Sequence, residues 1–192
     1  MRTALAHAVS IAGHPAILMP LAAGFAASAG GASPEMTRTI LWVTSGVVVA
    51  VLIYSLVQVR RGQWADTDAS RPEERSQLNL FLAPLLAAGA GWAWWSGQPL
   101  ALALGLGASA AIIAAALVSS RWMKLSLHTA FAVFAASLFW PDVRVVGAGL
   151  VLAGLIAWAR LHLKRHTAAD VAAGALAGAA AGSVVQILIA AP

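Results

Sequence analysis

The sequence predicts an all-α, polytopic membrane protein, a helix bundle with about six to seven transmembrane helices. Of its 192 residues, 60 % are apolar and only 10 % are charged, and the mean hydropathy is +0.82. These values lie far outside the composition of soluble globular domains. One crossing of the hydrocarbon core takes about 20 apolar residues, so the crossings use almost the whole chain. We therefore expect residues 1–192 to form a single integral membrane domain.

Seven apolar runs, bounded by charged residues or by Pro and Gly, define the expected helices. In chain order they cover approximately residues 4–28, 38–59, 78–96, 98–119, 125–140, 143–160 and 168–190. The first run contains Pro15 and Pro20, and we interpret it as one retained helix that is kinked at proline. The last three runs are rich in small residues, which let helix backbones approach closely in lipid.

The polar residues between the runs predict which connections share a membrane face. The amino terminus and residues 60–77, 119–126 and 160–170 are rich in charged and polar side chains, whereas the other connections carry few. Two expected spans separate each of these polar segments from the next. We therefore expect all four segments on one face of the membrane.

Composition excludes several kinds of function. The chain has no cysteine, which excludes disulfides, thiolate metal sites and cysteine nucleophiles. Its net charge of +5 is expected to report membrane topology and anionic lipid headgroups, and it does not imply nucleic acid as a partner.

The clearest chemical signal lies between residues 160 and 170. His166 and Asp170 are four residues apart, a spacing that places both on one face of a helix. An aspartate that accepts a hydrogen bond from one imidazole nitrogen leaves the other nitrogen as a nucleophile or general base. Alternatively, both residues simply cap and solvate the start of the last helix. Asp170 lies inside an apolar run, where charged groups are costly and tend to have functional partners.

Two further polar segments supply groups suited to an anionic substrate. Lys124, Ser126 and His128 precede or begin the fifth apolar run, and Arg71 and Arg75 lie one helical turn apart. Considered separately, His128 is an interfacial histidine, and Arg71 and Arg75 belong to a charged loop. Together with the third segment they match the needs of phosphoryl transfer, in which cations neutralise phosphate oxygens while one imidazole attacks and another protonates the leaving oxygen.

The third segment resembles a motif of the type 2 phosphatidic acid phosphatase and vanadium haloperoxidase superfamily, in its membrane-embedded lipid phosphatase branch. Arg160, His166 and Asp170 match S-R-x5-H-x3-D at the family spacing, with Ala159 in place of the serine. The resemblance covers roughly residues 60–182.

The other two family motifs are matched in part. Ser126 and His128 match P-S-G-H, with leucine at both remaining positions. Arg71 and Pro72 match the end of K-x6-R-P, but Trp64 stands where that motif has lysine. Either Arg75 or Lys124 supplies the missing cation, or the chain belongs to a divergent branch whose version of the motif uses Asp66, Asp68, Arg71 and Arg75.

The resemblance implies a metal-independent hydrolase of phosphoric esters or anhydrides that needs no cofactor. His166 would form a phosphohistidine, Asp170 would orient it, and His128 would protonate the leaving group and later activate water. The phosphate oxygens would be bound by Arg160, Ser126, Arg71, Arg75 and Lys124. An alternative in which Asp66 and Asp68 hold Mg²⁺ remains open at this stage.

The expected substrate is a lipid phosphate, because the chain has no soluble domain to present a soluble one. Phosphatidic acid, phosphatidylglycerol phosphate and a polyprenyl phosphate or diphosphate all fit. The alternative function is a non-enzymatic small transporter or lipid-binding membrane protein with a polar cavity. His14 is expected only to bond a carbonyl freed at the kink of the first run.

Basic residues predict the orientation of a multi-pass protein in the plasma (inner) membrane. After Arg71, Arg75, Lys124 and Arg160 are set aside as functional, six basic residues remain on the polar face, against Arg38 and Arg144 opposite. The positive-inside rule then places the site on the cytoplasmic face.

Overall fold

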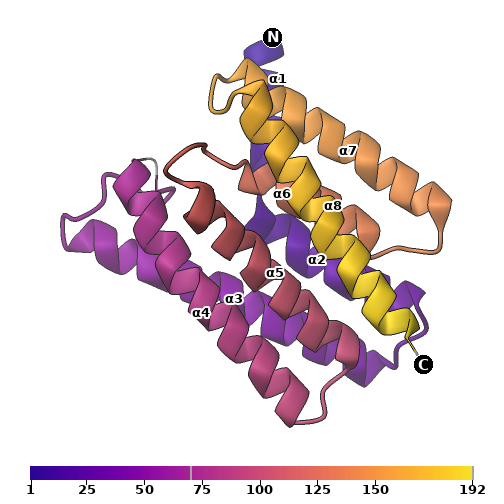
Figure 1. Ribbon diagram of the computed structural model, residues 1–192. Coiled ribbons are helices and arrows are strands. Elements are labelled where there is room, and N and C mark those ends of the chain that lie inside the picture. The colour runs from indigo at the N-terminus through magenta and orange to yellow at the C-terminus, as the bar shows by residue number, and fades with distance from the viewer. Residues whose placement is uncertain (70, 192) are drawn as a thin grey trace.

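The computed structural model describes residues 1–69 and 71–191. Within these residues the chain forms α-helices and no strands (Figure 1), which confirms the all-α prediction. The helices are α1 (Arg2–Ala12), α2 (Pro15–Ala29), α3 (Pro34–Arg60), α4 (Pro72–Trp95), α5 (Leu100–Ser119), α6 (Leu127–Ser137), α7 (Val143–His162) and α8 (Ala168–Ala190).

Five of these helices, α3, α4, α5, α7 and α8, are long and apolar enough to cross a membrane. The α1–α2 pair passes the same test only as a pair and is bent by 54°, so there are six spans if this pair counts as one. The first run forms two helices, not one kinked helix, because Gly13 ends α1 and Pro15 begins α2. The 11 residues of α6 extend about 16 Å at 1.5 Å per residue, which is too short to cross about 30 Å of hydrocarbon.

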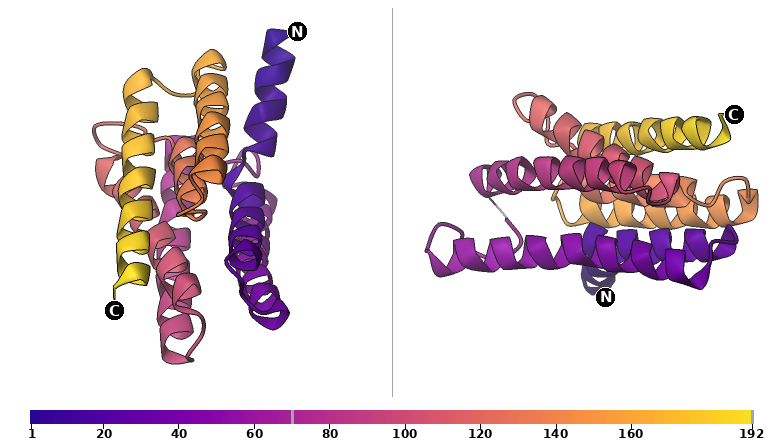
Figure 2. Two further views of the ribbon diagram at one scale, coloured as in Figure 1. Left: turned by 90° about the vertical axis from the view of Figure 1, so that its right-hand side faces the viewer. Right: turned by 90° about the horizontal axis from the view of Figure 1, so that it is seen from below.

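The helices form two groups. The views in Figure 2 show α1, α2 and α3 on one side of the molecule and α4, α5 and α8 on the other. Within these groups α2 packs along α3, and α4 packs along α5. Helix α6 lies between the groups and contacts α2, α7 and α8, while α3 and α4 touch each other at few positions. This arrangement leaves room between the groups.

Small residues let α8 pack tightly on α6. Gly174, Gly178 and Gly182 recur every fourth residue along one face of α8. A Cβ atom at Gly178 would collide with the carbonyl oxygen of Ala130 on α6, and one at Gly174 would collide with that of Ser126. The Ala- and Gly-rich composition of the last run therefore serves close helix packing, as expected in lipid.

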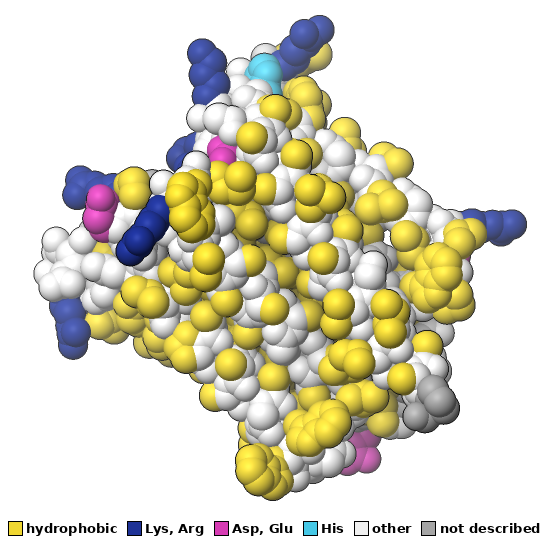
Figure 3. Space-filling view, viewed as in Figure 1, with side chains coloured by type: hydrophobic (Ala, Val, Ile, Leu, Met, Phe, Trp, Pro, Cys, Tyr) yellow, Lys and Arg dark blue, Asp and Glu magenta, His cyan; other side chains and the backbone are white. Residues whose placement is uncertain are grey.

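The polar connections gather at one end of the bundle, as predicted. The Lys124 ammonium donates to the Arg165 carbonyl across 2.9 Å, and the Thr3 hydroxyl lies 3.5 Å from Nε2 of His162. Nε2 of His14 lies 3.9 Å from the Asp68 carboxylate. Figure 3 shows most of the visible Lys and Arg side chains near this end, whereas hydrophobic side chains cover the middle of the molecule, as expected of a lipid-facing surface.

We predict that Gly178→Ala lowers the stability of the protein in detergent. The new methyl group must displace the Ala130 backbone, and overpacking of this kind costs about 1–3 kcal/mol. Thermal unfolding of the purified variant measures the loss. Gly154→Ala on α7 is the matched control, because a Cβ there meets no atom within 4 Å. Equal unfolding temperatures for the two variants would contradict the close contact between α6 and α8.

Candidate active site

A cavity of about 830 Å³ lies between α2 and α3 on one side and α4, α5, α6 and α8 on the other. At one end, here called the polar end, charged and imidazole side chains from separate segments of the chain line it. These side chains are His14, Asp68, Arg75, Lys124, His128, Arg160, Arg165 and His166. Five of the eight residues that the sequence analysis assigned to the site therefore line the cavity, and Asp170 lies just behind them. His14, Asp68 and Arg165 line the polar end as well, and the sequence analysis had not assigned them to the site.

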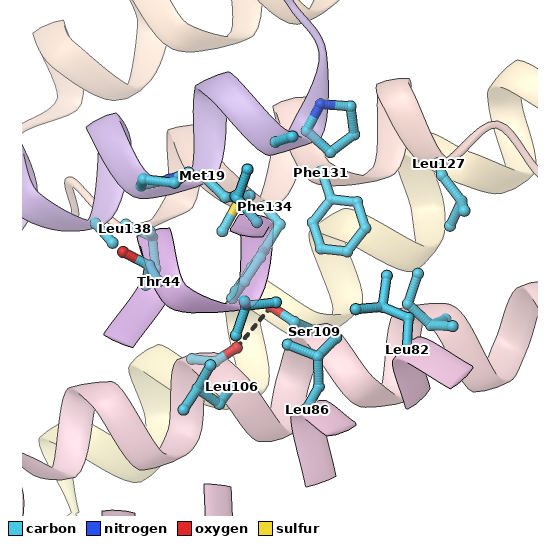
Figure 4. A pocket seen from close by; sticks show the side chains of 18 of the residues that line it. Met19, Thr44, Leu82, Leu86, Leu106, Ser109, Leu127, Phe131, Phe134 and Leu138 are labelled. Atoms are coloured by element: carbon cyan, nitrogen blue, oxygen red, sulfur yellow. Dashed lines mark hydrogen bonds between the residues drawn. The ribbon is translucent and has the colours of Figure 1, made fainter. Parts of the chain in front are cut away.

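The rest of the cavity is apolar. Figure 4 shows Met19, Leu86, Phe131 and Phe134, from α2, α4 and α6, around this part of the space. Two polar side chains there, on α5 and α3, bond to their own helices, and Gln186 of α8 donates to the Ser137 carbonyl of α6. The Ser109 hydroxyl donates to the Gly105 carbonyl at 2.8 Å, and the Thr44 hydroxyl donates to the Ile40 carbonyl at 2.7 Å. The cavity therefore joins a cationic end to a hydrocarbon-like interior.

His166 lies in the α7–α8 connection and has a defined tautomer. Its Nδ1 is 3.0 Å from the carbonyl oxygen of Lys124, and because a carbonyl only accepts, Nδ1 carries the proton. In the neutral ring Nε2 therefore carries a lone pair, which accepts a long hydrogen bond from Nη2 of Arg160 at 3.5 Å. Burial, and then the positive charges of Arg160 and Lys124, lower the pKa of His166 to about 4. The ring is thus neutral at physiological pH.

Asp170 acts on His166 through the backbone and not by direct contact. Its Oδ2 lies 3.9 Å from Nδ1 of His166, which is beyond hydrogen-bond distance. Instead, Oδ1 accepts from the Lys124 amide at 2.9 Å and Oδ2 accepts from the Thr167 amide at 2.8 Å. Asp170 therefore holds Lys124 in place, and the carbonyl of Lys124 in turn orients His166.

The capping box at the start of α8 explains why this carboxylate can be buried. The Thr167 hydroxyl accepts from the Asp170 amide while Asp170 accepts from the Thr167 amide, a reciprocal pairing that satisfies two helix-end donors. The interpretation of Asp170 as a helix cap is thus confirmed, and its role in a reaction stays a prediction.

His128 lies in the first turn of α6 and packs against His14. The two ring centroids are 5.0 Å apart and the rings are nearly perpendicular, at 86°. His14 accepts from the Ala16 amide at 3.2 Å and so caps α2. It therefore bonds an amide hydrogen, not the freed carbonyl that the sequence analysis expected. The His-Pro pair at a helix start is the only sequence signal for this placement.

The cations at the polar end differ in their hydrogen bonds and in their charged neighbours. Nη1 of Arg160 donates to the Ser10 hydroxyl at 2.9 Å, whereas its Nε is buried with no hydrogen-bond partner in the described part of the chain. Burial, and then the charges of Arg75, Arg160 and Arg165, lower the pKa of Lys124. Such crowding of cations is costly by itself and is relieved by an anion.

Two predicted phosphate-binding residues lie elsewhere. Ser126 is fully buried beneath α8, and its hydroxyl lies 3.0 Å from that of Thr129, so it does not line the cavity. Arg71 is exposed and faces the Glu74 carboxylate at 3.9 Å. The buried Glu74 accepts from the amides of Ala65 and Arg71, which fixes the α3–α4 connection and turns Arg71 outward.

The two aspartates considered for Mg²⁺ make different contacts. Asp66 Oδ1 accepts from the Asp68 amide at 2.8 Å, a local turn bond, and Asp68 faces His14. Among the described residues, no group of three or more His, Cys, Asp or Glu side chains has the arrangement of a metal site. The polar end instead offers a nucleophilic nitrogen, a second imidazole and several cations.

Comparisons of the chain with protein-family models, curated proteins and solved structures found no match. Functional assignment therefore depends on the geometry of the cavity and on the residues at its polar end.

We predict that His166 stays neutral, with its proton on Nδ1, at pH values between about 4 and its ordinary pKa of 6.5. A proton on the ring would be buried beside Arg160 and Lys124, so the folded protein disfavours it. Nitrogen-15 NMR of histidine-labelled protein measures both properties, and comparison with His166→Gln assigns the resonance. A midpoint near 6.5, or a proton on Nε2, would contradict this geometry.

Proposed function

We propose that the protein hydrolyses a phosphate ester or anhydride of a membrane lipid through a phosphohistidine intermediate. The observation that carries this proposal is one continuous cavity. Its polar end holds the unprotonated Nε2 of His166 beside the Arg160 guanidinium, and its remainder is apolar and lies between helices that are long and apolar enough to cross a membrane. A lipid phosphate has the same division into an anionic head and a hydrocarbon tail.

In the proposed reaction, the lone pair on Nε2 of His166 attacks phosphorus. Burial and the charge of Arg160 hold the pKa of His128 well below its usual range, so the ring takes the proton that it later gives from the phosphate monoanion as the substrate binds. The bond from phosphorus to the lipid oxygen then breaks, and that oxygen takes this proton from His128. Water then attacks phosphorus while His128 accepts its proton, which releases inorganic phosphate and restores His166. Arg160, Arg75 and Lys124 stabilise the charge on the phosphate oxygens throughout.

The length of the apolar part supports a lipid tail as its occupant. Residues of α5 line the cavity from Ala101 to Leu117, which corresponds to about 24 Å at 1.5 Å per residue. The hydrocarbon core of a bilayer is about 30 Å thick, so the cavity follows most of the membrane's thickness. A soluble phosphate ester would leave this space unused.

We predict that purified protein releases phosphate from lipid phosphates in detergent or vesicles with a chelator present. His166→Ala and His128→Ala are each expected to abolish release, because groups that act as a unit lose nearly all activity when one is removed. Asp170→Asn is expected to lose less, since the amide keeps one oxygen to accept a backbone hydrogen bond. The assay measures inorganic phosphate.

His162→Gln is the matched control. His162 lies on the last turn of α7, stacks on Trp158 and does not line the cavity, so its variant should keep the wild-type rate. Binding of lipid phosphates without release would instead favour the alternative of a transporter or lipid-binding protein. A His166→Ala variant that kept a tenth of the activity would exclude a phosphohistidine at this position.

We further propose that the polar end faces the cytoplasm in the plasma (inner) membrane. Five basic residues on this face neither line the polar end nor belong to the predicted site: Arg2, Arg60, Arg61, Arg121 and Lys164. The opposite face carries only two basic residues, Arg38 and Arg144. This excess follows the positive-inside rule.

We predict that Gln63→Cys in intact cells resists an impermeant thiol reagent while Ser96→Cys reacts. Both positions are exposed, Gln63 in the α3–α4 connection and Ser96 at the opposite end of α4, and the chain has no other cysteine. Permeabilised cells should label at both positions. Labelling of Gln63→Cys alone in intact cells would reverse the orientation.

A further inference from the structure

The elbow between α1 and α2 lies outside the part of the chain that resembles the phosphatase motifs, yet it reaches the polar end. Here "the elbow" means Gly13, His14 and Pro15. Gly13 packs against Ile156 of α7 so closely that a Cβ at this position would lie 2.5 Å from the Ile156 side chain. The position of His14 is therefore set by helix packing and not by a free loop.

Contacts from this region reach both imidazoles of the proposed reaction. On one side, the Ser10 hydroxyl accepts from Arg160, whose other terminal nitrogen lies 3.5 Å from Nε2 of His166. On the other side, the His14 ring makes its perpendicular contact with the ring of His128. The N-terminal helices therefore contribute to the site that the later helices build.

The tautomer of His14 follows from its helix cap. Nδ1 accepts from the Ala16 amide, so this nitrogen is unprotonated and the neutral ring carries its proton on Nε2. Nε2 lies 3.9 Å from Oδ1 of Asp68. This distance is beyond a hydrogen bond, but the negative charge of Asp68, in the α3–α4 connection, attracts the Nε2–H group, so His14 lies between this carboxylate and His128.

We propose that His14 is a positioning residue that holds the His128 ring in the orientation from which it gives its proton to the leaving oxygen, with Asp68 holding His14. This inference rests on the proposed function. Rotation about the last side-chain bond of histidine is broad, so His128 needs a neighbour to select one orientation. The His14 ring, fixed at its own Nδ1 by the cap of α2, supplies that neighbour.

The test compares two substrates with the same alkyl chain, an alkyl phosphate and an activated aryl phosphate. The aryl leaving group departs without a proton, so formation of the phosphohistidine needs the proton of His128 only with the alkyl phosphate. The later attack of water uses His128 with both substrates, so the measured step is the first turnover, the burst of released alcohol or phenol. The variant is His14→Asn, because asparagine can also accept from an amide at a helix start but has no ring. We expect the burst rate for the alkyl phosphate to fall about tenfold or more, with KM and the burst rate for the aryl phosphate nearly unchanged.

Asp68→Asn provides a second variant that leaves the α2 cap intact and changes an exposed side chain. It should produce a smaller loss with the same preference for the aryl phosphate. The double variant should lose no more than His14→Asn alone, because the two residues act in series. Asp142→Ala, which removes the cap of α7 at the opposite end of the bundle, controls for the loss of a helix cap and should leave the substrate preference unchanged.

The outcomes separate the two proposals. If wild-type protein releases no phosphate from either substrate, the proposed function fails. If wild-type protein is active but His14→Asn matches it on both substrates, or loses both equally, the positioning role is wrong while the proposed function stands. A selective loss with the alkyl phosphate supports the positioning role.

Discussion

The carboxylate of Asp170 connects the two segments on which the polar end depends. It accepts one hydrogen bond from the Lys124 amide, ahead of α6, and another from the Thr167 amide at the start of α8. A buried carboxylate is costly unless such donors surround it. Because both oxygens are engaged, the α6 start and the α8 start are held together, and with them His128 and His166.

The hydrogen bonds of Asp170 also determine which ring nitrogen of His166 carries the proton. The segment before α6 presents the Lys124 carbonyl to Nδ1 only while Asp170 holds the Lys124 amide. The tight packing of Gly174 against Ser126 then fixes the distance between α8 and the segment that precedes α6. Backbone geometry, more than any contact between side chains, thus leaves Nε2 of His166 facing the cavity.

Local pattern was sufficient to predict the long helices α3, α4, α5, α7 and α8 and several residues of the polar end. Hydropathy identified the long spans, and the spacing of Arg160, His166 and Asp170 marked one of the segments that meet there. The indirect role of Asp170 could not be predicted, because its partner Lys124 lies 46 residues away. The outward turn of Arg71 depends on Glu74, whose partners belong to a loop with no regular pattern.

Two other differences between the expected and the observed helices lie in the first and fifth apolar runs. Hydropathy treats residues 4–28 as one apolar segment, but Gly13 and Pro15 end one helix and begin the next. Hydropathy likewise cannot show that α6 ends at Ser137, well before Trp140. The His14 contact with His128 depends on both features, since it joins the break in the first span to the start of the short helix.

The internal bonding of Thr44 and Ser109 to their own helices has a consequence for how a lipid would enter and leave. A hydrocarbon chain that moves from the bilayer into such a space exchanges one apolar solvent for another, so it gains almost no hydrophobic free energy. In the proposed reaction, retention would then depend on the phosphate alone. Once that group is cleaved, nothing would oppose the return of the dephosphorylated lipid to the bilayer, and turnover would not be slowed by a tightly held product.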